Sequence, residues 1–171
     1  AKDHLADFQA VALPPGLLSI HPKVTLCFDI FLCWTSLPFS LSTSRSIHYL
    51  SCRAMGDRNK GEIKACIAAD LKIYRERGFE PTEVHADGEY NAVKGSFGNV
   101  HFSICSADDH VPEAERAIRS VKETVRATIH GMPYKRLPRV MVRDLVEFAA
   151  RTINMLPSSD GVSDTMSPET I

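Results

Sequence analysis

The order of its apolar segments is the feature that most restricts the fold of this chain. Three strand-length segments come first, within residues 24–32, 39–44 and 47–52, and no helix-length segment separates them. After residue 60 the sequence alternates between helical periodicity and short runs typical of buried strands. Consecutive strands pair antiparallel through short turns, whereas strands joined through helices pair parallel. We therefore predict an α/β fold with a mixed five-stranded sheet, a three-strand antiparallel meander plus parallel strands, flanked by helices.

The later elements follow from apolar spacing. Apolar residues recur at helical intervals within 60–77, 112–130 and 141–156, and each segment keeps a polar face. Two further strands are predicted at 82–86 and 100–107. The helix over 112–130 has the clearest pattern, because an apolar stripe and a polar stripe both run along its length.

Length and composition fit one folded domain with tails. The chain has 171 residues, of which 44% are hydrophobic and 24% charged, and this composition supports a buried core. We interpret residues 1–22 as a loosely ordered leader, 23–156 as the core and 157–171 as a C-terminal tail, in a chain truncated from a longer polypeptide. No apolar run is long enough to span a membrane. The five cysteines form no Cys-x-x-Cys pair, which favours reduced thiols in an intracellular, non-secreted protein.

Three acidic residues stand at positions that suit a metal site. Asp29 interrupts an apolar strand, Asp87 ends a strand, and Glu115 lies in the first turn of a helix, off its apolar stripe. Each also has an ordinary explanation: an edge strand tolerates an acid, Asp before Gly is a turn residue, and an acid favours a helix N-terminus. If the three carboxylates converge, their hard oxygens suit Mg²⁺ or Mn²⁺.

Each of these acids lies within a short sequence motif, and these motifs are called phrases below. They are FDIF at 28–31, VHADGEY at 84–90 and HVPEAERAIRSVKETVRA at 110–127, and the later LP, NMLP and TMSP accompany them. In this order they resemble the catalytic core of a copia-type retrotransposon integrase, in the ribonuclease H-like superfamily of polynucleotidyl transferases. The resemblance covers residues 23–170.

The resemblance implies a ribonuclease H-like fold and an enzyme that processes DNA ends and transfers strands during DNA integration. Carried over by position, Asp29, Asp87 and Glu115 become the catalytic and metal-binding triad for two Mg²⁺ or Mn²⁺ ions. Glu115 is preferred to Glu113 because Arg116 follows it directly, as in the family's third block. The resemblance also implies a homo-oligomer that acts on element ends and target DNA, in the nucleus when the target is chromosomal, without a membrane partner.

The sequence departs from the family in three respects. The connection between Asp87 and Glu115 is short, the residues before Glu115 read ADDHVPEA in place of a Gln-Asn-Gly type, and the zinc-binding His/Cys module is absent. Asp108 and Asp109 are therefore alternative metal ligands. Two other functions stay open: an inactive integrase remnant that serves only in nucleic-acid binding or assembly, and a ribonuclease H-type nuclease.

Positive charge is concentrated in one segment. Residues 112–143 carry eight basic and three acidic side chains, a net charge of +5, while the whole chain carries −1. This balance excludes a uniformly basic DNA-binding protein, but a local basic stripe suits a phosphodiester substrate. The alternative is a solvated helix face with ion pairs such as Glu115–Arg119. The predicted DNA-binding residues are Arg116, Arg119, Lys122, Arg126, Lys135 and Arg136.

The aromatic residues show no series for reading bases. Tyr134, in the basic loop after the helix, is the candidate for stacking on a base. We predict that Tyr74, Tyr90 and Trp34 pack in the core, because each belongs to an apolar pattern.

Overall fold

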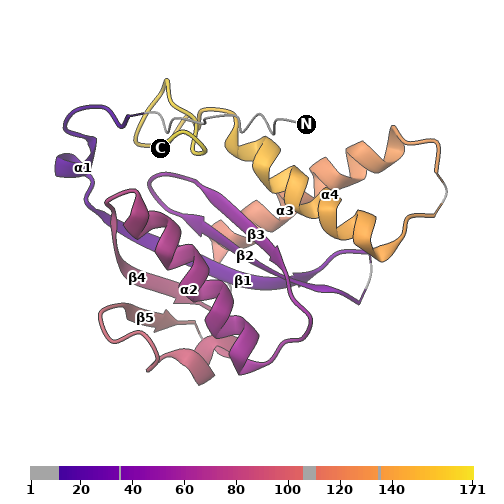
Figure 1. The fold of residues 1–171 in the computed structure, drawn as a ribbon, viewed down its shortest axis with the longest axis horizontal. Coiled ribbons are helices and arrows are strands. Elements are labelled where there is room, and N and C mark those ends of the chain that lie inside the picture. The colour runs from indigo at the N-terminus through magenta and orange to yellow at the C-terminus, as the bar shows by residue number, and fades with distance from the viewer. Residues whose placement is uncertain (1–11, 35, 106–110, 135) are drawn as a thin grey trace, which may run out of the picture.

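The computed structural model describes residues 12–34, 36–105, 111–134 and 136–171, and shows a sheet with helices on both faces (Figure 1). Within these residues, no helix is long and apolar enough to cross a membrane. The elements, in chain order, are α1 (Leu17–Ile20), β1 (Lys23–Leu32), β2 (Pro38–Ser44), β3 (Leu50–Ala54), α2 (Lys60–Glu76), β4 (Glu80–Ala86), the 3₁₀ helix η1 (Gly88–Val93), β5 (His101–Ile104), α3 (Pro112–His130) and α4 (Arg139–Asn154).

The sheet has five strands in the order β3-β2-β1-β4-β5. β1 pairs antiparallel with β2, and β2 pairs antiparallel with β3, so the first three strands form a meander. β4 pairs parallel with both β1 and β5. The predicted mixed sheet flanked by helices is therefore confirmed, and β1 is its central strand.

The two faces of β1 are covered by different helices. Leu26, Phe28 and Ile30 belong to the core on the α2 side, whereas Cys27 and Phe31 belong to the core under α3 and α4. Successive side chains of a strand point to opposite faces, which explains why almost the whole strand is apolar. By the same alternation, position 29 faces α3.

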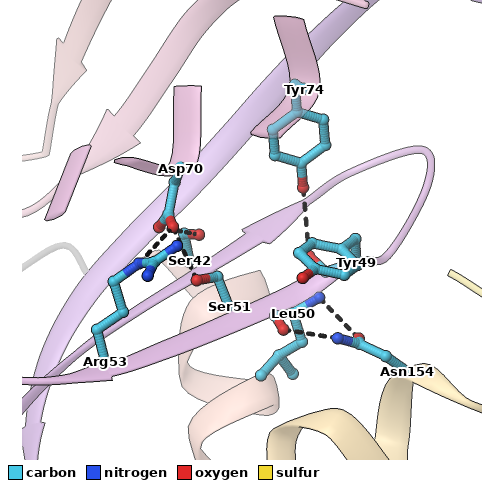
Figure 2. Close-up of polar contacts among 8 residues, drawn as sticks. All are labelled: Ser42, Tyr49, Leu50, Ser51, Arg53, Asp70, Tyr74 and Asn154. Atoms are coloured by element: carbon cyan, nitrogen blue, oxygen red, sulfur yellow. Dashed lines mark hydrogen bonds and ion pairs between the residues drawn. The ribbon is translucent and has the colours of Figure 1, made fainter. Parts of the chain in front are cut away.

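A buried carboxylate joins α2 to the meander (Figure 2). Asp70 is only 2% exposed, and its oxygens accept hydrogen bonds from the hydroxyls of Ser42 and Ser51, both at 2.7 Å. Arg53 Nε donates a third bond at 2.9 Å. A buried carboxylate is costly unless it is paired in this way. The contact fixes α2 against β2 and β3.

The outer edge of β3 is closed by α4 (Figure 2). The side-chain amide of Asn154 donates to the carbonyl of Leu50 at 2.7 Å, and its oxygen accepts from the amide of Leu50 at 2.8 Å. An unpaired edge strand exposes hydrogen-bonding groups to other chains. Asn154 satisfies one residue of that edge and anchors the end of α4.

The third strand is displaced from its predicted position. It was predicted over 47–52 and lies at Leu50–Ala54. The turn after β2 is longer than expected, and within it His48 takes a left-handed conformation with φ of 61°. Ile47 is buried, but it fills the α2-side core from this turn and pairs with no strand.

The predicted core positions of the aromatic residues are confirmed for two of three. Tyr74 and Tyr90 are 3% and 0% exposed. The prediction for Trp34 is wrong, since it is 52% exposed. Trp34 follows the end of β1 in a left-handed conformation with φ of 46°, which turns it away from the strand's alternation.

The C-terminal tail contains no helix or strand, yet it packs on the core. Figure 1 shows it beside the end of α4, where the amide of Glu169 donates to the carbonyl of Asn154. Arg77 donates to the carbonyls of Thr170 and Ile171, at 2.6 and 2.8 Å. The side chain of Ile171 is buried in the α2-side core.

Candidate functional site

Asp29 and Asp87 both lie just beyond the last aligned pair of the two central parallel strands. Cys27 of β1 is aligned with His85 of β4, and both acids follow these residues by two positions. Neighbouring strands lie about 4.8 Å apart, and aligned residues of parallel strands share a face. Asp87 directly follows the carboxyl end of β4, the edge where α/β sheets commonly hold ligands, and Asp29 lies within β1 three residues before its end.

Local hydrogen bonds hold both carboxylates. Asp29 is half-buried, and its Oδ1 accepts from the amide of Ile30 at 2.6 Å. Asp87 caps η1, because its Oδ1 accepts from the amide of Glu89 at 3.0 Å. A capping residue has a restricted side chain. The backbone therefore orients both acids before any ligand binds.

Tyr90 supports the region beneath the two acids. Its ring packs against Phe28 of β1, with ring centroids 5.9 Å apart, and its hydroxyl group is buried. Burial raises the pKa of Tyr90 well above its usual value, and the charges of Asp87 and Asp29 raise it further. Tyr90 thus ties η1, and with it Asp87, to the strand that carries Asp29.

α3 adds the third acid and three cations. One side of the helix is buried against β1 and β2, and Glu115 lies on the exposed side. Between α3 and the end of β1 is a hollow of about 420 Å³, which we call the acidic–basic hollow. Its lining residues are Asp29, Phe31, Glu115, Ile118, Arg119, Lys122, Glu123 and Arg126.

Lys122 is held in place within this hollow. Its Nζ lies 5.4 Å from the centroid of the Phe31 ring, a cation–π contact, and its side chain is half-buried. Arg119 and Arg126 are exposed on the adjacent turns of α3. The sequence predicted these three cations from their spacing, and the structure places them in one hollow with Asp29 and Glu115.

Glu113 and Glu115 line different hollows on the surface. Glu113 Oε1 lies 2.8 Å from Arg45 Nε, and it lines a second hollow that does not include Asp29. Burial alone would raise the pKa of the Glu113 carboxyl group. A hydrogen bond from its own backbone amide and the charge of Arg45 have the larger combined effect, so the pKa is lowered. Glu115, and not Glu113, lines the acidic–basic hollow together with Asp29.

The other predicted DNA-binding residues lie elsewhere. Arg116 lines the second hollow, of about 170 Å³, together with Arg45 and His48. Arg136 is exposed in the loop between α3 and α4. Lys135 lies outside the described residues, as do Asp108 and Asp109.

The three predicted metal ligands do not form a closed cluster. Asp87 is not part of the lining of the acidic–basic hollow. In the part of the chain that the structure describes, no three His, Cys, Asp or Glu side chains stand in position to hold one ion. The donors nevertheless fit Mg²⁺ or Mn²⁺ chemically, because carboxylate oxygens are the preferred ligands of these ions. The assignment of the triad stays a prediction.

The cysteines near the hollow are uncharged at neutral pH. None of the five cysteines, all within the described residues, forms a disulfide bond. Burial raises the pKa of the Cys27 thiol to about 11, and Glu113 adds to the shift. Burial also raises the pKa of Cys33 to about 11, against the effect of Lys122. Both thiols therefore stay protonated and add no negative charge to this face.

Comparison with known proteins supports the fold. The sequence matches no protein-family model and no curated protein. Among solved structures, the catalytic core domain of BIV integrase has a TM-score of 0.56 and 13% identity over 85% of this chain and 90% of that chain. The HTLV-2 integrase catalytic core domain in complex with magnesium has a TM-score of 0.62, with 14% identity in its trimeric form and 12% in its dimeric form. Both HTLV-2 comparisons cover 89% of this chain and 97% of that chain.

The chain has the fold of an integrase catalytic core. At this level of identity the likeness concerns the fold alone, and the predicted ribonuclease H-like fold is confirmed. The similar structures are retroviral, so the copia-type origin stays a prediction from the sequence phrases.

Proposed function

We propose that this chain is the catalytic core of a copia-type retrotransposon integrase, a polynucleotidyl transferase that acts on DNA phosphodiesters. The observation that carries the proposal is the acidic–basic hollow, in which Asp29 and Glu115 meet Arg119, Lys122 and Arg126. A phosphodiester substrate needs cations for its non-reacting phosphates and oxygen ligands for divalent metal at the reacting one. The resemblance of the three sequence phrases points to the same chemistry.

The side chains divide these tasks between the two sides of the hollow. Arg119, Lys122 and Arg126 neutralise backbone phosphates along α3. Asp29, Asp87 and Glu115 would hold Mg²⁺ or Mn²⁺, and the bound metal would supply a Lewis acid for the attacking and leaving oxygens of the phosphodiester. Asp29 lies within a strand and Asp87 at the end of one, so the sheet holds both rigidly, as a metal site requires. The HTLV-2 core, solved with magnesium, supports this choice of metal.

The proposal includes the partners and the place of action. DNA is the substrate, both as the element end and as the target. Dimeric and trimeric forms of the HTLV-2 core support assembly of this chain into a homo-oligomer. Action on chromosomal DNA requires that the protein reach the nucleus.

A strand-transfer assay tests the enzyme. The purified chain is incubated with a labelled blunt-ended duplex and Mg²⁺ or Mn²⁺, and products longer than the input are measured. Asp87→Asn and Glu115→Gln should each lower the yield at least about a hundredfold, because each removes a metal-binding oxygen. Glu123→Gln is the matched control, since it removes an acid of the same hollow that is outside the triad. Products that form without metal, or that persist in Asp87→Asn, would contradict the proposal.

A non-catalytic DNA-binding module is the second candidate. It is favoured by one observation, that the described residues contain no ready-made group of three metal ligands. A folded chain that binds DNA but yields no product with either metal would support this function. An RNA–DNA hybrid serves as a further substrate, and cleavage of the hybrid alone would support a ribonuclease H-type nuclease.

A further inference from the structure

Trp34 is a large apolar side chain that the fold leaves in solvent. It is 52% exposed, although it stands two residues after β1, a central strand, and Leu32, the last residue of that strand, is 47% exposed. Trp34 also has φ of 46°, in the left-handed region that costs a non-glycine residue about 1 kcal/mol or more. Residues with a strained backbone cluster at active sites and ligand-binding sites.

The surroundings of Trp34 are basic. A hollow of about 200 Å³ is lined by Leu32, Cys33, Trp34, Lys122 and Arg126. Lys122 and Arg126 also line the acidic–basic hollow, so the same two cations border both hollows. The lining of this smaller hollow contains no acidic side chain, and burial raises the pKa of its thiol, Cys33, to about 11.

We propose that Trp34 is a stacking platform for an unpaired nucleobase of the DNA, with Lys122 and Arg126 on the phosphates that flank that base. An exposed aromatic ring beside two cations is the combination that binds single-stranded nucleic acid: the ring covers a base and the cations follow the backbone. A base inside a duplex has both faces covered by its neighbours. Only a frayed, overhanging or extruded base can therefore reach the indole.

The position of Trp34 defines what this subsite does. It lies two residues after β1, the strand that carries Asp29, and Lys122 and Arg126 line both hollows. A nucleotide stacked on Trp34 would hold the DNA end next to the carboxylates. This inference rests on the proposed DNA function and adds to it a preference for ends with unpaired nucleotides.

The chain carries its own reporter for this test, because Trp34 is its only tryptophan. The full chain is titrated, without added metal, with a blunt-ended duplex and with the same duplex carrying unpaired nucleotides at one end. Binding is followed by the anisotropy of a label on the DNA, and stacking by the emission of Trp34. We expect both duplexes to bind, and we expect the duplex with the unpaired end to bind more tightly and to quench the indole.

Variants separate stacking from general affinity. Trp34→Ala should weaken binding of the duplex with the unpaired end about tenfold, or about 1.4 kcal/mol, within the range of base–aromatic stacking. It should leave binding of the blunt duplex unchanged, and Trp34→Phe should restore part of the loss. Phe148→Ala is the matched control, because Phe148 is also an exposed aromatic residue, 56% exposed, but lies on α4 outside both hollows. Phe148→Ala should bind both duplexes like the parent.

Three results would overturn the inference. The first is equal binding of the unpaired end by Trp34→Ala and the parent. The second is an equal loss for both duplexes, which would give Trp34 a general role. The third is a change in Trp34 emission with protein concentration and no DNA, which would place the indole between copies of the chain. If the parent chain binds neither duplex, the proposed function itself fails, and that result is distinct from these three.

Discussion

Asp70 shows how a single residue can decide the stability of this fold without belonging to its proposed chemistry. Its carboxylate lies at 2% exposure and accepts three hydrogen bonds from two strands (Figure 2). The donors include only one charged group, Arg53, whose side chain is 37% exposed. Loss of the carboxylate charge would leave the hydroxyls of Ser42 and Ser51 with a poorer partner in a buried site.

We expect Asp70→Asn to lower the free energy of unfolding by about 2–3 kcal/mol, because an amide group cannot accept all three bonds and its NH₂ group opposes the donors. Urea unfolding measures the change. Asp144→Asn, at an exposed acid paired with Arg143, is the control and should change stability by less than about 0.5 kcal/mol. Equal effects of the two substitutions would contradict this account of Asp70.

At the same scale, sequence and structure agree for some residues and differ for others. Asp29 and Asp87 were identifiable because an acid inside or directly after an apolar strand is unusual. Asp70 was not identifiable as a buried, paired acid. The sequence shows only one acid on an amphipathic helix and gives no sign of the strand hydroxyls that face it. Trp34 was misplaced because an aromatic residue at the end of an apolar run is normally part of the core, and a left-handed backbone leaves no signal in such a run.

Among the elements, α3 connects the fold to the site. Its bounds, Pro112–His130, agree with the prediction because two continuous stripes and an N-terminal proline define it. Its position on the sheet could not be predicted, since this depends on contacts with distant strands. One such contact is the ion pair between Glu113 and Arg45, which ties the first turn of α3 to the turn after β2.

This ion pair should make part of the stability depend on pH. The pKa of Glu113 is lowered in the folded chain from its usual value of 4.5, so the folded state favours the ionised carboxyl. Its contribution is present above that value and is lost as the pH falls through the lower, folded pKa. The pair is partly exposed, so it contributes at most about 1 kcal/mol.

The measurement is urea unfolding of the parent and Glu113→Gln between about pH 7 and about pH 3. We expect the variant to be less stable near neutral pH, with a difference that shrinks as the pH falls. Arg45→Gln should show the same trend, because it removes the other partner. A difference that stays constant or grows in acid would show that Glu113 acts in another way.

For the whole molecule, the essential property is the separation of charge. The chain has a net charge of −1, yet residues 112–143 carry +5. The fold places α3 on one face of the sheet and α2 on the other, so the cations of α3 gather on one side. The sequence predicted this basic stripe, but its meeting with Asp29 in one hollow depends on the register of β1 and on the packing of α3, which spacing alone does not determine.

DNA binding should therefore depend strongly on salt. Each phosphate contact contributes about −0.9 to the slope of log K against log salt concentration. We expect Arg119→Gln, Lys122→Gln and Arg126→Gln each to make the slope less steep by about that amount, measured by anisotropy with a blunt duplex. Lys64→Gln, at an exposed position on α2, should leave it unchanged. If Lys64→Gln made the slope less steep by the same amount as the three α3 variants, the attraction of DNA would not depend on the position of the cations.

Binding of Mn²⁺ tests the central claim most directly, because it asks whether three acids from distant parts of the chain serve one metal site. The signal of free Mn²⁺ in electron paramagnetic resonance is followed as the protein is added, for the parent and for Asp29→Asn, Asp87→Asn, Glu115→Gln and Glu123→Gln. The account predicts that the parent and Glu123→Gln remove Mn²⁺ from solution, and that each of the other three loses affinity at least about tenfold. Binding by Asp87→Asn or Glu115→Gln as tight as that of the parent would contradict it.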